Sequence, residues 1–133
     1  RQISFALVDL ALHREYDPAV HGDVVEYARK TGEQVSPVPL PKDYAMILGF
    51  SHLFADAVGY AAGYYSYKWA EVLDADAFSR FKKEGVFNTD VGTEFRNKVL
   101  SRGNEADAAD LFRDFMGREP SSQALMERQG LVR

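Results

Sequence analysis

The sequence predicts an all-α fold made of several helices. Apolar residues return every three or four positions along most of the chain, and glycines follow several of these periodic segments. Signals for strands are scarce, because the chain has no Asn-Gly or Asp-Gly hairpin turn and no long alternation of apolar and polar residues. A length of 133 residues fits one domain or one piece of a larger domain.

The chain is expected to begin with a helix over residues 2–16. This segment carries two apolar stripes, which is typical of a helix that packs on both sides. Asp17 is a candidate N-cap, and Pro18 suits the first position of a second, short helix. That helix is predicted to end near Lys30, with Gly32 after it.

The next part of the chain is predicted to be irregular. Within residues 31–43, three alternating prolines disfavour the α conformation of the residues before them and predict extended geometry: Pro37, Pro39 and Pro41. Residues 45–54 are apolar but show no clean helical period.

Four helices are expected in the second half of the chain. They run from about Tyr60 to Lys83, from Asn88 or Thr89 to about Arg102, from about Ala106 to Met116, and from Pro120-Ser121-Ser122 through Met126. Glycines are predicted to end them: Gly85, Gly103, Gly117 and Gly130.

Composition excludes several classes of protein. The net charge of −4 argues against a nucleic-acid binder that neutralises phosphates. The absence of cysteine excludes disulfide scaffolds, Cys-ligated zinc and thiol nucleophiles. No apolar run is long enough to span a membrane, and no secretory signal segment is evident.

The histidines do not form a recognisable metal motif. His13, His21 and His52 include no pair at helical ligand spacing and no HExxH motif. They are interpreted as surface or capping residues, and no zinc is expected to bind this chain alone.

Four tyrosines are concentrated in one short segment. If the helix begins near Tyr60, then Tyr60, Tyr64, Tyr67 and the carboxylate of Glu71 share one stripe about 60° wide. Tyr65 and Trp69 then point away from this stripe and are expected to lie in the core.

The tyrosine stripe has two interpretations. It is either an aromatic core stripe with its hydroxyls at the rim, or a row of phenols that faces a cleft. A neutral phenol can donate a hydrogen bond to a developing oxyanion, and His52 could do the same.

Two runs of sequence carry a resemblance to a known family. They are Phe50-Ser51-His52-Leu53-Phe54 and Gly59-Tyr60-Ala61-Ala62-Gly63-Tyr64-Tyr65-Ser66-Tyr67-Lys68-Trp69-Ala70-Glu71-Val72-Leu73. Together with Arg1–Leu7, Glu84–Asn88, Ser101–Gly103 and Gly117–Pro120, they resemble the C-terminal part of the zinc oligopeptidases of the thimet oligopeptidase and oligopeptidase A family, with dipeptidyl carboxypeptidase as a near relative.

The resemblance implies a function that composition does not. Enzymes of that family are all-α and hold zinc through an HExxH helix and a further Glu, neither of which this chain contains. Residues 1–133 are therefore expected to be the C-terminal portion of an oligopeptidase catalytic domain that hydrolyses short peptides, and to be inactive alone. The mode of cleavage, endopeptidase or dipeptidyl carboxypeptidase, stays open.

The resemblance also implies roles for four side chains. His52 and Tyr67 would polarise the scissile carbonyl and stabilise the oxyanion, whereas Tyr60 and Tyr64 would hold the substrate. The eight positions from His52 to Tyr60 exceed the spacing of the family pattern.

A second hypothesis belongs to another class of protein. The chain could be a non-enzymatic helical interaction module whose aromatic stripe is core or partner surface. With either function, the two apolar sides of the helix at 2–16 predict exposed apolar surface and self-association.

Overall fold

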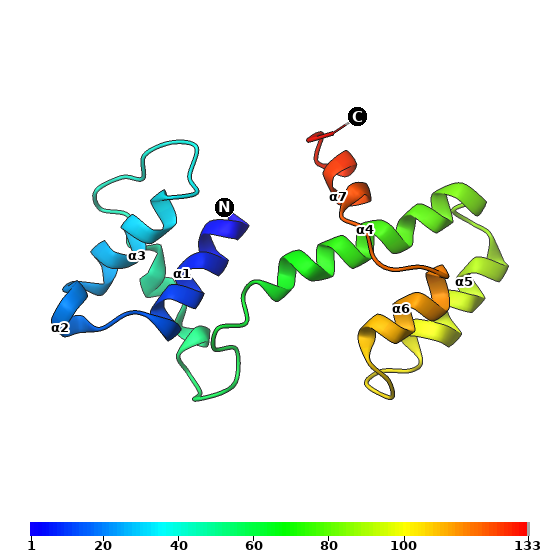
Figure 1. Cartoon of the computed structure of the whole chain (residues 1–133), viewed down its shortest axis with the longest axis horizontal. Coiled ribbons are helices and arrows are strands. Elements are labelled where there is room, and N and C mark those ends of the chain that lie inside the picture. Colours follow the sequence, from blue (N-terminus) through cyan, green and yellow to red (C-terminus); the bar gives the residue numbers. More distant parts are fainter. Residues whose placement is uncertain (133) are drawn as a thin grey trace. The chain divides into compact units, whose positions relative to one another are not determined.

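The computed structural model describes residues 1–132, which contain helices and no strand. The α-helices are α1 (Gln2–Arg14), α2 (Pro18–His21), α3 (Val24–Glu33), α4 (Ser66–Glu84), α5 (Thr89–Phe95), α6 (Ala108–Met116) and α7 (Gln123–Arg128) (Figure 1). Two 3-10 turns, η1 (Met46–Gly49) and η2 (Ser51–Leu53), and a π-helical turn, η3 (Arg96–Leu100), complete the set. The predicted all-α class is confirmed.

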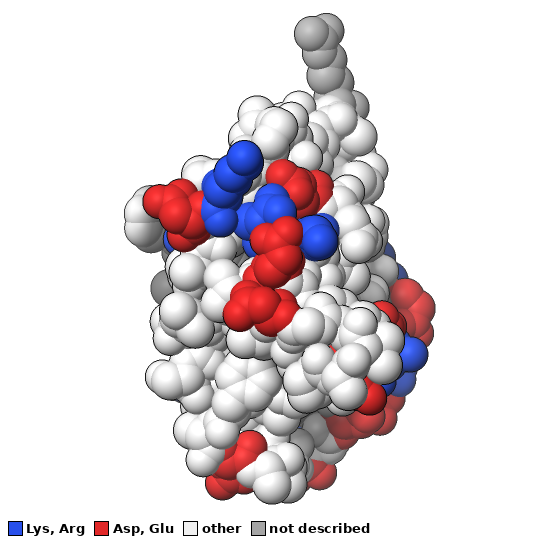
Figure 2. Space-filling model, turned by 90° about the vertical axis from the view of Figure 1, so that its left-hand side faces the viewer, with Lys and Arg blue, Asp and Glu red and all other residues white. Residues whose placement is uncertain are grey.

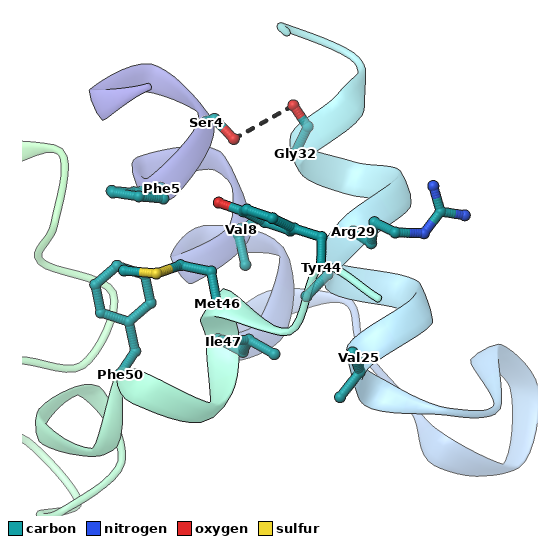
Figure 3. A pocket seen from close by; sticks show the side chains of 11 residues that line it. Ser4, Phe5, Val8, Val25, Arg29, Gly32, Tyr44, Met46, Ile47 and Phe50 are labelled. Carbon is teal, nitrogen blue, oxygen red and sulfur yellow. Dashed lines mark hydrogen bonds between the residues drawn. The ribbon is translucent and has the colours of Figure 1, made fainter. Parts of the chain in front are cut away.

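The chain divides into two compact units, residues 1–68 and the residues from Trp69 onward. In the first unit, α1 lies against α3, and η1 covers the same junction (Figures 1 and 3). The hydroxyl of Ser4 donates a hydrogen bond of 3.3 Å to the carbonyl oxygen of Gly32. A Cβ atom at Gly32 would lie 2.7 Å from the Ser4 oxygen, so a larger residue there would force the Ser4 hydroxyl out of this position.

The short second helix was predicted as one segment, and this prediction is wrong. Asp17 does cap Pro18–His21, since its side chain accepts a hydrogen bond from the Ala19 amide. The chain then turns at Gly22, where φ is +71°, and Asp23 caps the separate helix α3. Helix α3 runs through Gly32 to Glu33, so the predicted stop at that glycine is also wrong.

The second unit has an aromatic core. Its buried residues and the half-buried side chains around them come from α4, α5, η3 and α6: Ala77, Val91, Phe112 and Phe115, with Leu73, Phe81, Phe95, Val99 and Met116. The predicted helix to Arg102 is not uniformly α-helical, because the Ser101 amide donates to the carbonyl of Arg96, five residues earlier.

A buried carboxylate fastens the last segment of this unit to α4. Asp76 is 2% exposed and accepts hydrogen bonds from both Nη atoms of Arg118, at 2.8 and 2.6 Å. The backbone amide of Ser121 donates a third bond of 2.7 Å. The Arg118 guanidinium holds the pKa of Asp76 below its usual value, and the Ser121 amide adds to this effect.

The charged side chains are of mixed sign. On the face drawn in Figure 2, acidic and basic groups stand next to one another. On α3, for example, Arg29 bonds to Glu26 and Glu33, and the neighbouring guanidinium lowers the pKa of Glu26 to about 2. Among the described residues, no helix is both long enough and apolar enough to cross a membrane.

Candidate functional site

A pocket of about 260 Å³ opens in the first unit, beside the start of α4. Its volume admits part of a peptide side chain or backbone, although it is slightly smaller than typical ligand pockets. The residues that line it come from η2, the following loop and the first turn of α4: His52, Leu53, Tyr60, Gly63, Tyr64, Ser66 and Tyr67. The pocket thus brings together all four side chains singled out in the sequence.

A second cavity lies between α1, α3 and η1, but it is too small to be a binding site. Its volume is about 10 Å³, roughly the space of one water molecule. Figure 3 shows the Tyr44 ring extending between the two helices, with Met46 directed toward the Phe50 ring. We therefore regard it as a packing defect of the core.

The aromatic rings of the larger pocket contact one another in pairs. His52 and Tyr60 lie edge to face, with ring centroids 5.9 Å apart. Tyr64 and Tyr67 are tilted, with centroids 5.1 Å apart. Phe50 connects the two pairs, since its ring lies 5.7 Å from His52 and 5.3 Å from Tyr64.

The four side chains differ in exposure. Tyr60 and Tyr67 are 66% and 53% exposed, and His52 is exposed as well. Tyr64 is half-buried, because its ring packs against the buried cluster of Phe5, Phe50 and Leu53. Tyr64 therefore anchors the loop to the core and still lines the pocket, while the other three groups are more exposed.

The geometry behind this grouping differs from the predicted helical stripe. Helix α4 begins at Ser66, so Tyr60 and Tyr64 lie in a loop of successive turns. In this loop, Ala62 has a φ of +53°, the only positive φ at a non-glycine residue in the described chain. The conformation costs roughly 1–2 kcal/mol and is incompatible with a helix that starts at Tyr60.

Two further predictions for this segment are wrong. Tyr65 and Trp69 were assigned to the core, yet they are 48% and 62% exposed. Their predicted directions assumed that the helix already existed at Tyr60. Glu71, the predicted fourth member of the stripe, lies four residues after Tyr67 on the same helix α4.

The sequence argument missed Asp9, which lies on α1 and is 0% exposed. Its carboxylate accepts hydrogen bonds from the Ala62 amide at 3.2 Å and from the Tyr64 amide at 2.8 Å. His13 Nδ1 lies 3.0 Å from Asp9 Oδ1 and 2.9 Å from the Asp9 carbonyl, and since both oxygens are acceptors, this nitrogen carries the proton. An acidic residue within the apolar run of 2–12 was the signal available in the sequence, because a buried charge needs partners.

The pocket offers hydrogen-bond donors rather than metal ligands. Three phenols and an imidazole can donate a hydrogen bond to a carbonyl oxygen. Within residues 1–132, no three His, Cys, Asp or Glu side chains are placed so that they could hold a metal ion. The residues present do not fit a zinc site.

Comparison with known proteins extends over nearly the whole chain. The family model of peptidase family M3 matches residues 1–131. Oligopeptidase A of Escherichia coli (strain K12) is 46% identical over 131 residues, which cover 98% of this chain and 19% of that protein. A probable cytosolic oligopeptidase A of Arabidopsis thaliana is 45% identical over 138 residues, covering 99% and 19%.

The chain is also similar, at lower sequence identity, to a second type of enzyme. Dipeptidyl carboxypeptidase of Escherichia coli (strain K12) is 32% identical over 131 residues, covering 97% of this chain and 19% of that protein. The chain therefore spans about a fifth of the length of these relatives.

Proposed function

Because the chain belongs to peptidase family M3, we propose that it supplies the substrate-binding and oxyanion-stabilising side of a zinc oligopeptidase that cleaves short peptides. In this proposal, residues 1–133 form the C-terminal portion of the catalytic domain. Its relatives named oligopeptidase A and dipeptidyl carboxypeptidase support peptides as the substrate class.

The pocket at the start of α4 is the observation that carries the proposal. It gathers His52 and three tyrosines, and two of the phenols are more than half exposed. An interaction module would need no such convergence of donors. The alternative hypothesis of a non-enzymatic helical module is therefore the weaker one.

We assign the four side chains to two tasks. Tyr67 and His52 donate hydrogen bonds to the scissile carbonyl, and these bonds strengthen as the oxygen becomes negatively charged. Each such donor is typically worth about 3 kcal/mol in the transition state. Tyr60 and Tyr64 hold the peptide through their rings and hydroxyls, so their contribution is to binding.

Zinc belongs to another part of the enzyme in this proposal. The described residues contain no set of ligands for it. We place the enzyme in the cytoplasm, as the name of one Arabidopsis relative states for that protein, although a second Arabidopsis relative is named chloroplastic/mitochondrial.

The isolated chain is predicted to cleave no peptide, because donors to an oxyanion do not generate a nucleophile. The test compares it with a chimaera, oligopeptidase A of Escherichia coli whose matching segment is replaced by residues 1–131 of this chain. We expect quenched-fluorescent peptides to be cleaved by the chimaera and left intact by the 133-residue chain. A chimaera that folds but shows no activity would overturn the proposed function.

We also propose that the isolated chain self-associates. Several large apolar side chains are strongly exposed, among them Ile3 at 62%, Trp69 at 62% and Phe87 at 96%. Association would remove such surface from water. Sedimentation velocity should show a concentration-dependent average mass, and a strict monomer at all concentrations would contradict this expectation.

A further inference from the structure

We propose that Asp9 is a positioning residue for the tyrosine pocket, an inference that rests on the function proposed above. Asp9 lies outside the pocket, and it acts by fixing the loop that carries Tyr60 and Tyr64. This loop, residues 55–65, lies between Phe54, the residue that follows η2, and the start of α4.

The Asp9 carboxylate joins this loop to α1 through two backbone amides. Oδ1 accepts from Ala62 and Oδ2 accepts from Tyr64, so each oxygen holds one peptide group. The two bonds span 53 and 55 residues of sequence. The other bonds within this loop are local turns, such as the Gly63 amide to the Tyr60 carbonyl at 3.2 Å.

Ala62, whose amide donates to Asp9, is also the residue of the loop with a strained backbone. A φ of +53° is unfavourable for alanine, and such a conformation persists only where surrounding contacts enforce it. Asp9 supplies this enforcement, since its oxygen fixes the amide of the strained residue itself. Without this acceptor, we expect the segment to relax toward ordinary backbone angles and Tyr60, two residues earlier, to move.

Helix α1 also holds the ring of Tyr64. Phe5 lies one turn before Asp9 on α1, and its ring is edge to face with Tyr64 at 5.8 Å. One helix therefore fixes both the backbone amide and the ring of the same tyrosine. The rings of Tyr64 and Tyr67 are in contact, and Tyr67 lies in the first turn of α4. A shift of Tyr64 would therefore also displace the Tyr67 ring.

The burial of Asp9 indicates that its charge has a specific purpose. Burial of a carboxylate destabilises the fold unless hydrogen bonds compensate for the lost water. An apolar residue at this core position on α1 would carry no such penalty. His13 donates to the same carboxylate and stacks on Phe54 with centroids 5.0 Å apart, directly before the loop. The cluster of Asp9 and His13 thus fixes both the entry and the middle of the loop.

The first test measures amide hydrogen exchange by NMR in the 133-residue chain. Asp9→Asn keeps the size of the side chain but replaces one acceptor oxygen by an NH₂ group, which cannot accept from an amide. The remaining oxygen can still accept from one amide, so we expect at least one of the Ala62 and Tyr64 amides to exchange at least ~10-fold faster, while amides of α3 and α6 are unchanged. Asp43→Asn, an exposed aspartate of the same unit, is the matched control and should change neither.

Two results of this test would overturn the proposal. One is unchanged exchange at Ala62 and Tyr64 in Asp9→Asn. The other is a general loss of protection that includes α3, because Asp9 would then be a residue for global stability and not for positioning.

The second test uses the chimaera and a double-mutant cycle. Asp9→Asn should lower kcat/KM roughly 10- to 100-fold, mainly by raising KM, because the tyrosines assigned to substrate binding are displaced. If Asp9 acts through Tyr64, the combined loss in Asp9→Asn with Tyr64→Phe is smaller than the product of the two single losses. Independent, multiplicative losses would overturn the proposal.

The two tests separate this inference from the proposed function. An inactive chimaera with the unmutated segment would overturn the proposed function. The exchange measurement in the 133-residue chain would then still decide whether Asp9 holds the loop.

Discussion

Tyr67→Phe in the chimaera is expected to lower kcat by roughly 10²–10³-fold and to change KM little. The substitution removes one hydroxyl and keeps the ring, so the contact with the Tyr64 ring at 5.1 Å survives. A donor that bonds mainly to the oxyanion stabilises the transition state and not the bound substrate, and its loss therefore appears in kcat.

Tyr65→Phe is the matched control for this prediction. Tyr65 is two residues away, is 48% exposed and does not line the pocket. Removal of its hydroxyl should leave kcat within a factor of about 2, since the residue touches no reacting group. If Tyr67→Phe and Tyr65→Phe behave alike in steady-state kinetics, the oxyanion role of Tyr67 is wrong.

Asp76→Asn is expected to lower the free energy of unfolding by roughly 2–4 kcal/mol at pH 7. Asparagine removes the charge and turns an NH₂ group toward donors that need acceptors, namely the Arg118 guanidinium and the Ser121 amide. The Arg118 side chain is 45% exposed, and its access to water keeps the loss below that of a fully buried pair. Urea unfolding of the 133-residue chain, followed by circular dichroism, measures the change.

The pH dependence of this loss has a definite sign. The folded state lowers the pKa of Asp76 below its ordinary value of 3.8, so the carboxylate stabilises the fold above that pH. The contribution decreases as the pH falls below 3.8 through the lower pKa of the folded state. The difference in stability between the Asp76→Asn variant and the unmutated chain should therefore shrink in acid.

Asp74→Asn provides the control, two residues away on the same helix. Asp74 bonds to Arg128 at 2.7 Å, but its side chain is 67% exposed. Exposed ion pairs contribute about 0–1 kcal/mol, so this variant should unfold almost like the unmutated chain. Equal losses in the two variants would contradict the importance that we give to burial.

Helices whose signals are local in sequence could be predicted well. For α6, the sequence predicts a start near Ala106 and an end at Gly117, and the structure begins it at Ala108 after the Asp107 cap. Gly117 closes the helix with a φ of +70°, as the pattern requires. Both signals lie within a few residues of the helix end, so no distant contact was needed to interpret them.

The start of α4 could not be predicted, because a distant residue determines it. The tyrosine segment has helical periodicity, yet Asp9 accepts the Ala62 and Tyr64 amides and holds them in turns. A sequence pattern contains no information on which buried carboxylate will reach a given amide. The pocket still gathers the predicted His52, Tyr60, Tyr64 and Tyr67, but the turns of the loop, and not one helical face, bring them together.

The long span of the two Asp9 bonds bears on the order of folding. The pocket residues lie within positions 52–67, whereas the bonds that fix their backbone close chain segments of 53 and 55 residues. Closing such a segment costs chain entropy before any contact is gained, and contacts of this range slow folding. We expect α1 and α3 to pair first and the tyrosine loop to become ordered afterwards, so a synthetic peptide of residues 50–68 would carry every side chain of the pocket and still form no pocket.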